Sequence, residues 1–108
     1  MKGLFDFLAG RKRRQQVWAA TLRRNIQRAL EEGRYPFALK YCQELLEVAP
    51  QDVEAWLLRG HLAWKHENNV ALAVECYRKV LILGGYDSSN VSVAKARACL
   101  AQLLAPEP

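Results

Sequence analysis

The sequence has few residues that ligate metals or form disulfides. It contains three cysteines (Cys42, Cys76 and Cys99) and two histidines (His61 and His66). An odd number of cysteines without a CxxC pair does not suit a disulfide framework, and histidines five residues apart do not share a helix face as zinc ligands would. We therefore expect no metal or other cofactor, and we interpret Cys42 and Cys76 as small core residues in a reducing compartment.

Long hydrophobic runs are also missing. The longest is Val80–Leu83, whereas a membrane-spanning helix needs about 20 apolar residues. The apolar residues near the N-terminus include Asp6 and are followed, not preceded, by positive charges, which is not the order of a secretory signal. Residues 1–14 are rich in arginine but lack the serine of a mitochondrial transit peptide, so we expect a cytoplasmic protein.

The chain lacks the motifs of common enzyme classes. No nucleophile has a general base at a recognisable spacing, and Gly84-Gly85 lacks the Lys and Ser/Thr of a phosphate-binding loop. The carboxylates Glu31, Glu32 and Glu44 fall on the expected outer faces of helices. We therefore predict that the protein is not an enzyme.

Acidic residues are scarce in the N-terminal third. Residues 1–34 hold nine Lys/Arg and three acids, a net charge of +6, whereas residues 35–108 carry −1. Residues 1–14 combine an apolar group with a run of four bases, and a short helix of that kind binds an anionic membrane surface. The predicted membrane-contact residues are Leu4, Phe5, Phe7, Leu8, Arg11, Lys12, Arg13 and Arg14.

Other interpretations of this charge stay open. The apolar side chains of residues 1–14 dock on the rest of the chain or on a partner, or the segment is disordered, because Gly3 and Gly10 weaken a helix. Further along, Arg24 and Arg28 lie one helical turn apart, as in proteins that follow a phosphate backbone. No aromatic residue is interleaved with them, so a nucleic acid is an unlikely partner.

Apolar residues recur at steps of three and four through the rest of the chain, which predicts helices. The expected helices are 15–32, 35–48, two within 53–83 joined by a turn at 67–69, and 89–104. In the first, the expected buried stripe is Trp18, Leu22, Ile26, Ala29 and Leu30. Asp52 is the expected cap of the third helix. Gly60, inside that helix, predicts a close approach of a neighbouring helix, so we expect it to accept alanine but not a large residue.

The chain repeats itself with an offset of 35 residues. Residues 38–46 align with residues 73–81, and an internal period near that value is typical of helical repeat arrays. The second copy carries Trp56, Gly60, Ala73, Tyr77 and Val80. The first carries Gly33, Tyr35, Ala38, Cys42, Leu45 and Pro50.

Over roughly residues 17–85 these positions resemble the tetratricopeptide repeat family. The family period is 34, so we place the extra residue at Asn68-Asn69. The family's closing proline is replaced by Gly84-Gly85 in the second copy. In the first copy the opening helix has Leu22, Asn25 and Ile26 in place of Trp, Leu and Gly.

The resemblance implies an all-α fold of about five helices, arranged as antiparallel helix pairs in a right-handed α-solenoid. The implied organisation is a basic and apolar segment at 1–14 and a repeat domain at 15–105, with repeats at 18–52 and 53–85 and a capping helix at 89–104. Burying the apolar face of such an array takes about three repeats. Residues 1–14 or a second copy of the chain would then complete the core.

The resemblance also implies a function, because such arrays bind partners in a concave groove lined by the first helix of each pair. The implied groove residues are Arg23, Gln27, Leu30, Leu57, Leu58, His61, Trp64, Lys65 and Lys95. Arg23 and Gln27 resemble a pair that clamps a peptide C-terminus in some members, whereas Leu58 and Cys99 depart from that pattern. The chain is thus expected to be an adaptor, scaffold or chaperone-like module that binds a protein or peptide. The alternative is a module tethered to an anionic membrane surface by residues 1–14.

Overall fold

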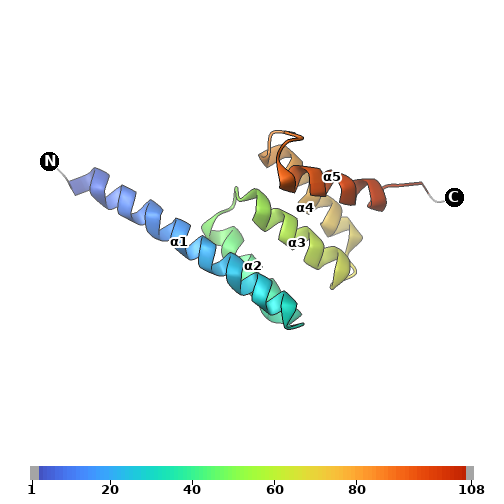
Figure 1. The fold of residues 1–108 in the computed structure, drawn as a ribbon, viewed down its shortest axis with the longest axis horizontal. Helices are drawn as coiled ribbons and strands as arrows, with labels where there is room; N and C mark the ends of the chain where they lie inside the picture. Colours follow the sequence, from blue (N-terminus) through green and yellow to red (C-terminus); the bar gives the residue numbers. More distant parts are fainter. Residues whose placement is uncertain (1–2, 107–108) are drawn as a thin grey trace. The chain divides into compact units, whose positions relative to one another are not determined.

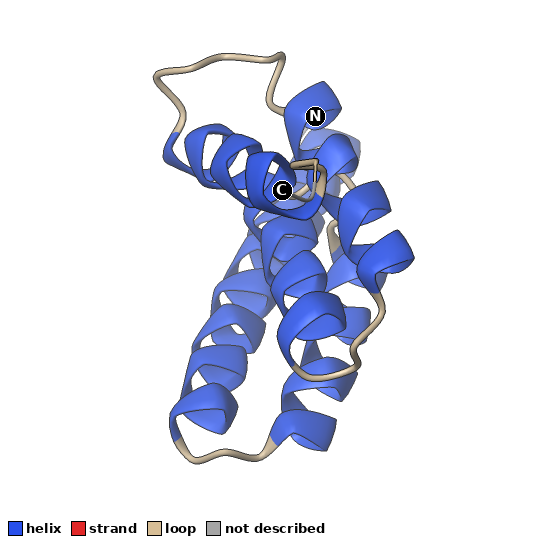
Figure 2. Cartoon of the chain, turned by 90° about the vertical axis from the view of Figure 1, so that its right-hand side faces the viewer, coloured by secondary structure: helices blue, strands red, loops and turns tan. Residues whose placement is uncertain are grey.

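The computed structural model describes residues 3–106, which form helices and loops and no strand (Figures 1 and 2). The helices are α1 (Gly3–Glu31), α2 (Tyr35–Val48), α3 (Val53–Lys65), α4 (Val70–Leu83) and α5 (Val91–Leu103). The all-α prediction is confirmed. The chain divides into two compact units, unit 1 (Met1–Pro50) and unit 2 (Gln51–Pro108). Stacking of repeats into a solenoid stays a prediction.

Unit 1 is a hairpin of two helices, in which α1 packs against α2. The turn between them depends on Gly33, which has a φ of +71°. This left-handed conformation is strained for any residue with a Cβ. It lets the amide of Arg34 donate to the carbonyl of Ala29 over 2.7 Å, which closes the end of α1. Pro36 lies in the first turn of α2, as its missing N–H allows.

The first helix is longer than the sequence predicted. We expected it to begin at Gln15, but α1 begins at Gly3 and runs for 29 residues. No proline interrupts residues 3–31. The segment is rich in residues with high helix propensity (Leu, Ala, Arg and Gln), and these offset the cost of Gly10 inside the helix. Residues 3–14 are therefore the first turns of α1 and not a separate segment.

The predicted buried stripe of α1 is right in its C-terminal half and wrong at its start. Leu22, Ile26 and Ala29 are buried, but Trp18 is 47% exposed. Leu30 is half-buried. The stripe is covered only from Ala19 onward, and Trp18 lies before that part.

Unit 2 is a three-helix assembly in which α4 packs against both α3 and α5. Its core combines residues of all three helices: Leu57, Ala63, Ala73, Tyr77, Val80, Val93, Ala96 and Leu100. The predicted close approach at Gly60 is confirmed, because a Cβ built there would lie 2.7 Å from Cε1 of the buried Tyr77. Cys42 and Cys76 are buried, as expected for core residues.

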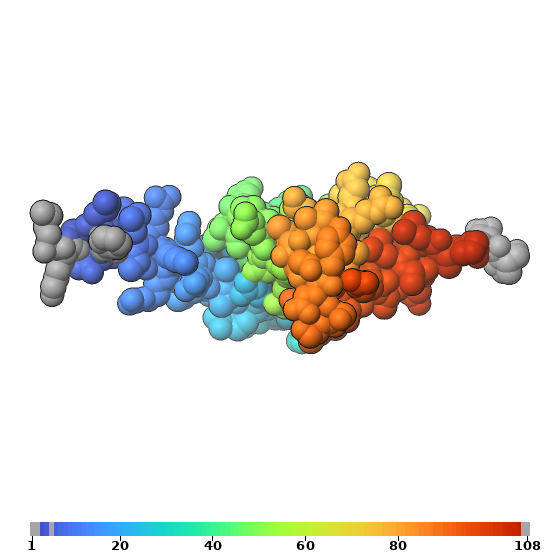
Figure 3. Space-filling view, turned by 90° about the horizontal axis from the view of Figure 1, so that it is seen from above, coloured from blue at the N-terminus to red at the C-terminus, as the bar shows by residue number. Residues whose placement is uncertain are grey.

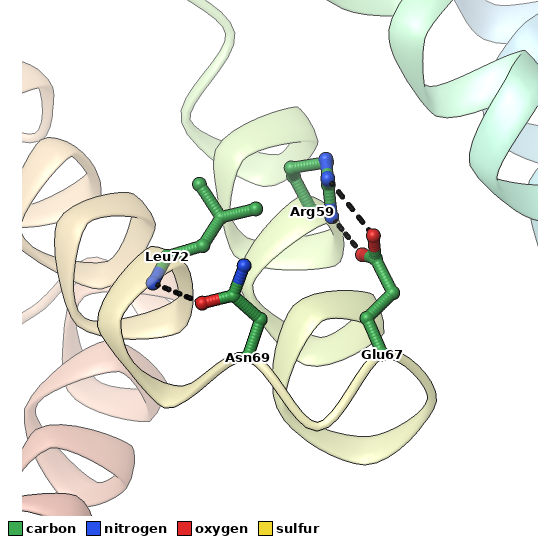
Figure 4. Close-up of polar contacts among 4 residues, drawn as sticks. All are labelled: Arg59, Glu67, Asn69 and Leu72. Atoms are coloured by element: carbon green, nitrogen blue, oxygen red, sulfur yellow. Dashed lines mark hydrogen bonds and ion pairs between the residues drawn. The ribbon is translucent and has the colours of Figure 1, made fainter.

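Side-chain caps set the starts of the helices in unit 2. The carboxylate of Asp52 accepts a hydrogen bond from the amide of Ala55 over 2.9 Å, as predicted. In the α3–α4 turn, Asn69 accepts from the amide of Leu72 over 3.1 Å, and Arg59 of α3 pairs with Glu67 (Figure 4). Asn90 caps α5, which therefore begins at Val91 and not at the predicted Ser89.

Candidate functional site

Two lysines and a histidine form a positively charged region in unit 2. His61 and Lys65 lie one turn apart on α3, and Lys95 lies on α5, which packs against α3. Both ammonium groups are on exposed residues, and His61 is half-buried. Burial lowers the pKa of His61, and the charges of Lys95 and Lys65 lower it further. Both lysines therefore act electrostatically on the same imidazole.

A hydrogen bond to Tyr77 orients His61. Nδ1 of His61 lies 2.6 Å from the hydroxyl oxygen of Tyr77. Burial raises the pKa of Tyr77, and a hydrogen bond with the side chain of Cys99 raises it further. The hydroxyl of Tyr77 therefore keeps its proton at neutral pH. Nδ1 of the neutral imidazole is thereby engaged by Tyr77, and Nε2 is the ring nitrogen that Tyr77 does not use.

Trp64 adds an apolar surface beside this imidazole. It follows His61 by three residues, so the two share one face of α3. Its ring meets Tyr77 edge-on, with 6.5 Å between ring centroids and an interplanar angle of 86°. The Lys65 ammonium lies 3.7 Å from the centroid of the Trp64 ring, in cation–π geometry. The indole is only half-buried, so part of it is open to a ligand.

Two of the predicted groove residues on α3 are not accessible. Leu57 is 5% exposed and Leu58 is 7% exposed. Leu57 belongs to the same buried cluster as Val93 and Ala96 of α5, so α5 closes over the position that the repeat phasing had assigned to the groove. Leu57 is therefore part of the core of unit 2, and neither Leu57 nor Leu58 offers much accessible surface to a partner.

The remaining predicted groove residues belong to unit 1. Arg23 and Leu30 are half-buried, and Gln27 is exposed. Arg23 and Gln27 line a shallow hollow on α1 with Arg24, Arg28 and Glu31. Arg23 and Gln27, which the sequence paired as a basic residue and an amide one turn apart, thus line the same hollow.

The predicted membrane-contact residues all lie on the first half of α1. Leu4, Phe7, Leu8 and the bases at 11–14 are exposed. The side chain of Phe5 lies outside what the structure describes. No helix within residues 3–106 combines the length and hydropathy needed to cross a bilayer.

Sequence reasoning missed the roles of Tyr77 and Cys99. Tyr77 matched a repeat signature position, and nothing in the local pattern pairs it with His61, which lies 16 residues earlier. The one usable signal was Gly60, because a close helix contact there brings the ring of Tyr77 against α3.

The described residues contain no group of three His, Cys, Asp or Glu side chains able to hold a metal ion. Comparisons with protein-family models, curated proteins and solved structures found no match.

Proposed function

We propose that the protein is an interaction module of the tetratricopeptide-repeat type, and that unit 2 binds a carboxylate-bearing peptide segment of a protein partner. The proposed contact surface, the basic-aromatic face, consists of His61, Trp64, Lys65 and Lys95. The observation that carries the proposal is the position of the Lys65 ammonium, 3.7 Å from the centroid of the Trp64 ring, on a helix that packs against the helix of Lys95. This arrangement suits binding of an anion better than a catalytic step.

The charges of the basic-aromatic face are not neutralised within the described part of the chain. Neither Lys65 nor Lys95 has an acidic partner among residues 3–106. A carboxylate placed between them would accept charge-assisted hydrogen bonds, which are about twice as strong as neutral ones. In the tautomer that carries its proton on Nε2, His61 offers a further donor. A neighbouring apolar side chain of the ligand would pack on the open part of Trp64.

A random peptide library with free C-terminal carboxylates tests this proposal. Peptides that the wild-type protein enriches are resynthesised with a fluorophore, and their affinity is measured by anisotropy. Lys65→Glu/Lys95→Glu should weaken binding roughly 10- to 100-fold, because hydrogen bonds to charged groups contribute about 1.5–3 kcal/mol. Trp64→Ala should weaken it as well.

The matched control is Arg78→Glu/Lys79→Glu, which makes the same change in net charge at exposed positions of α4. This variant should bind the peptides like the wild type. The proposal fails if no peptide is enriched, or if both charge reversals weaken binding equally, since the second result would indicate attraction by net charge alone.

A further inference from the structure

The first half of α1 extends beyond its partner helix in unit 1. At about 1.5 Å per residue, the 29 residues of α1 span about 44 Å, whereas the 14 residues of α2 span about 21 Å. Figure 1 shows the N-terminal turns of α1 continuing past the end of α2. Every described residue that is buried in α1 lies at Ala19 or later. The N-terminal half is therefore a helix without a covering layer.

This uncovered half still carries an apolar stripe. Leu4, Phe7 and Leu8 are 71%, 58% and 48% exposed. At about 100° per residue, Leu4 and the buried Leu22 point in the same direction, and Phe7, Leu8 and Trp18 fall within about 60° of it. The face that packs on α2 thus continues toward the N-terminus, where α2 no longer covers it.

Four consecutive bases surround the helix next to this stripe. Successive residues turn by about 100°, so Arg11 lies on the stripe, Lys12 and Arg14 lie on its two sides, and Arg13 lies opposite. All four are exposed, and the space-filling view shows side chains projecting on opposite sides of this part of α1 (Figure 3). We call these four residues the basic ring.

We propose that the first half of α1 binds an anionic lipid surface, with Leu4, Phe7 and Leu8 among the acyl chains and the basic ring among the lipid phosphates. The positions of the bases agree with this arrangement. The centre of the basic ring lies about 7 Å along the axis from Leu8. Lys12 and Arg14 flank the stripe, so their long side chains can reach the phosphates while their apolar stems cover the stripe.

The charge pattern favours lipid over the other occupants of an apolar helix face. A second copy of the chain would bring two basic rings together and create repulsion. An anionic bilayer instead strengthens binding about fivefold for each base near it. Trp18, one turn beyond Arg14, supplies the amphipathic ring that proteins place at the membrane–water interface.

Sedimentation of the full chain with vesicles tests the proposal. Vesicles of phosphatidylcholine with phosphatidylserine should bind the protein. Pure phosphatidylcholine vesicles should bind it on the order of several hundredfold more weakly, because each of the four bases contributes about fivefold. Arg11→Gln/Lys12→Gln/Arg13→Gln/Arg14→Gln should remove this preference. Phe7→Ser/Leu8→Ser should weaken binding to both vesicle types without changing the melting temperature, because both side chains are exposed.

A matched control removes four exposed bases elsewhere, at Arg28, Lys40, Arg78 and Lys79. The control with Gln at these positions should bind anionic vesicles within about threefold of the wild type. Equal losses in the control and the ring variant would overturn the proposal, because net charge would then explain binding. Absence of vesicle binding would overturn it too, as would a dimer in gel filtration that Phe7→Ser/Leu8→Ser dissociates.

Discussion

Replacing Gly60 by alanine tests the packing that positions the basic-aromatic face. The new Cβ would lie 2.7 Å from Cε1, 3.0 Å from Cδ1 and 3.1 Å from Cζ of Tyr77. Carbon atoms pack best at about 3.5–4.0 Å, so the ring would have to move by about 0.8 Å. Tyr77 is fully buried and its hydroxyl is hydrogen-bonded to His61, which leaves the ring little freedom to move.

Two opposing effects set the magnitude. Overpacking of a core contact costs about 1–3 kcal/mol, whereas alanine in place of glycine inside a helix contributes about 1 kcal/mol of stability. Gly60→Ala should therefore be destabilising by about 1 kcal/mol, a loss of roughly 4–8 °C in Tm for a domain of this size. This corrects the expectation from sequence that Gly60 accepts alanine.

Thermal melts followed by circular dichroism measure the effect. The control is Gly10→Ala in α1, where the nearest atom to the added Cβ is the flexible Arg14 guanidinium at 3.5 Å. Gly10→Ala should not lower the Tm. Leucine at position 77 makes room for the Cβ, so Gly60→Ala should cost less in a Tyr77→Leu background than in the wild type. A Gly60→Ala protein that melts at or above the wild-type temperature would refute the reasoning.

Two further predictions concern stability. Burial lowers the pKa of His61, and the charges of Lys95 and Lys65 lower it further. The neutral imidazole therefore contributes its full share to the free energy of unfolding above about pH 6.5. This contribution is lost as the pH falls from there through the lowered pKa, because the unfolded state binds the proton first. Melts between pH 7.5 and 5.0 should show this slope in the wild type and in His66→Gln but not in His61→Gln, and an equal slope in His61→Gln would contradict the assignment. Loss of the α3 cap in Asp52→Ala should cost about 1 kcal/mol in urea unfolding, whereas Ser88→Ala should change little.

The helix boundaries that the sequence predicted well are those marked by local chemistry. Asp52 caps α3 because its carboxylate reaches an amide three residues on, and Gly84 ends α4. Both depend on neighbours in sequence. The start of α1 was missed because the glycines and the basic run indicated a separate segment, although neither breaks a helix that contains no proline.

The errors in burial have a different cause. Periodicity correctly predicted which face of α1 is apolar, but it carries no information about how far α2 extends along that face, and Trp18 is consequently exposed. Similarly, the repeat phasing placed Leu57 in the groove without accounting for the cover that α5 provides. The bond between His61 and Tyr77 joins two helices, so no local pattern predicts it.

The two proposed surfaces both attract anions, so salt dependence alone cannot assign a bound ligand to either. With a Debye length of about 10 Å at 0.1 M salt, added salt would weaken peptide binding at Lys65 and Lys95 and lipid binding at the basic ring alike. The surfaces differ in their apolar component and in their location, because Trp64 lies in unit 2 and Phe7 lies in unit 1. Lys65→Glu/Lys95→Glu should therefore lose peptides and keep most vesicle binding, and Phe7→Ser/Leu8→Ser should do the reverse. If either variant lost both activities with its Tm unchanged, the two ligands would share one surface, and the separate roles proposed for the two units would be wrong.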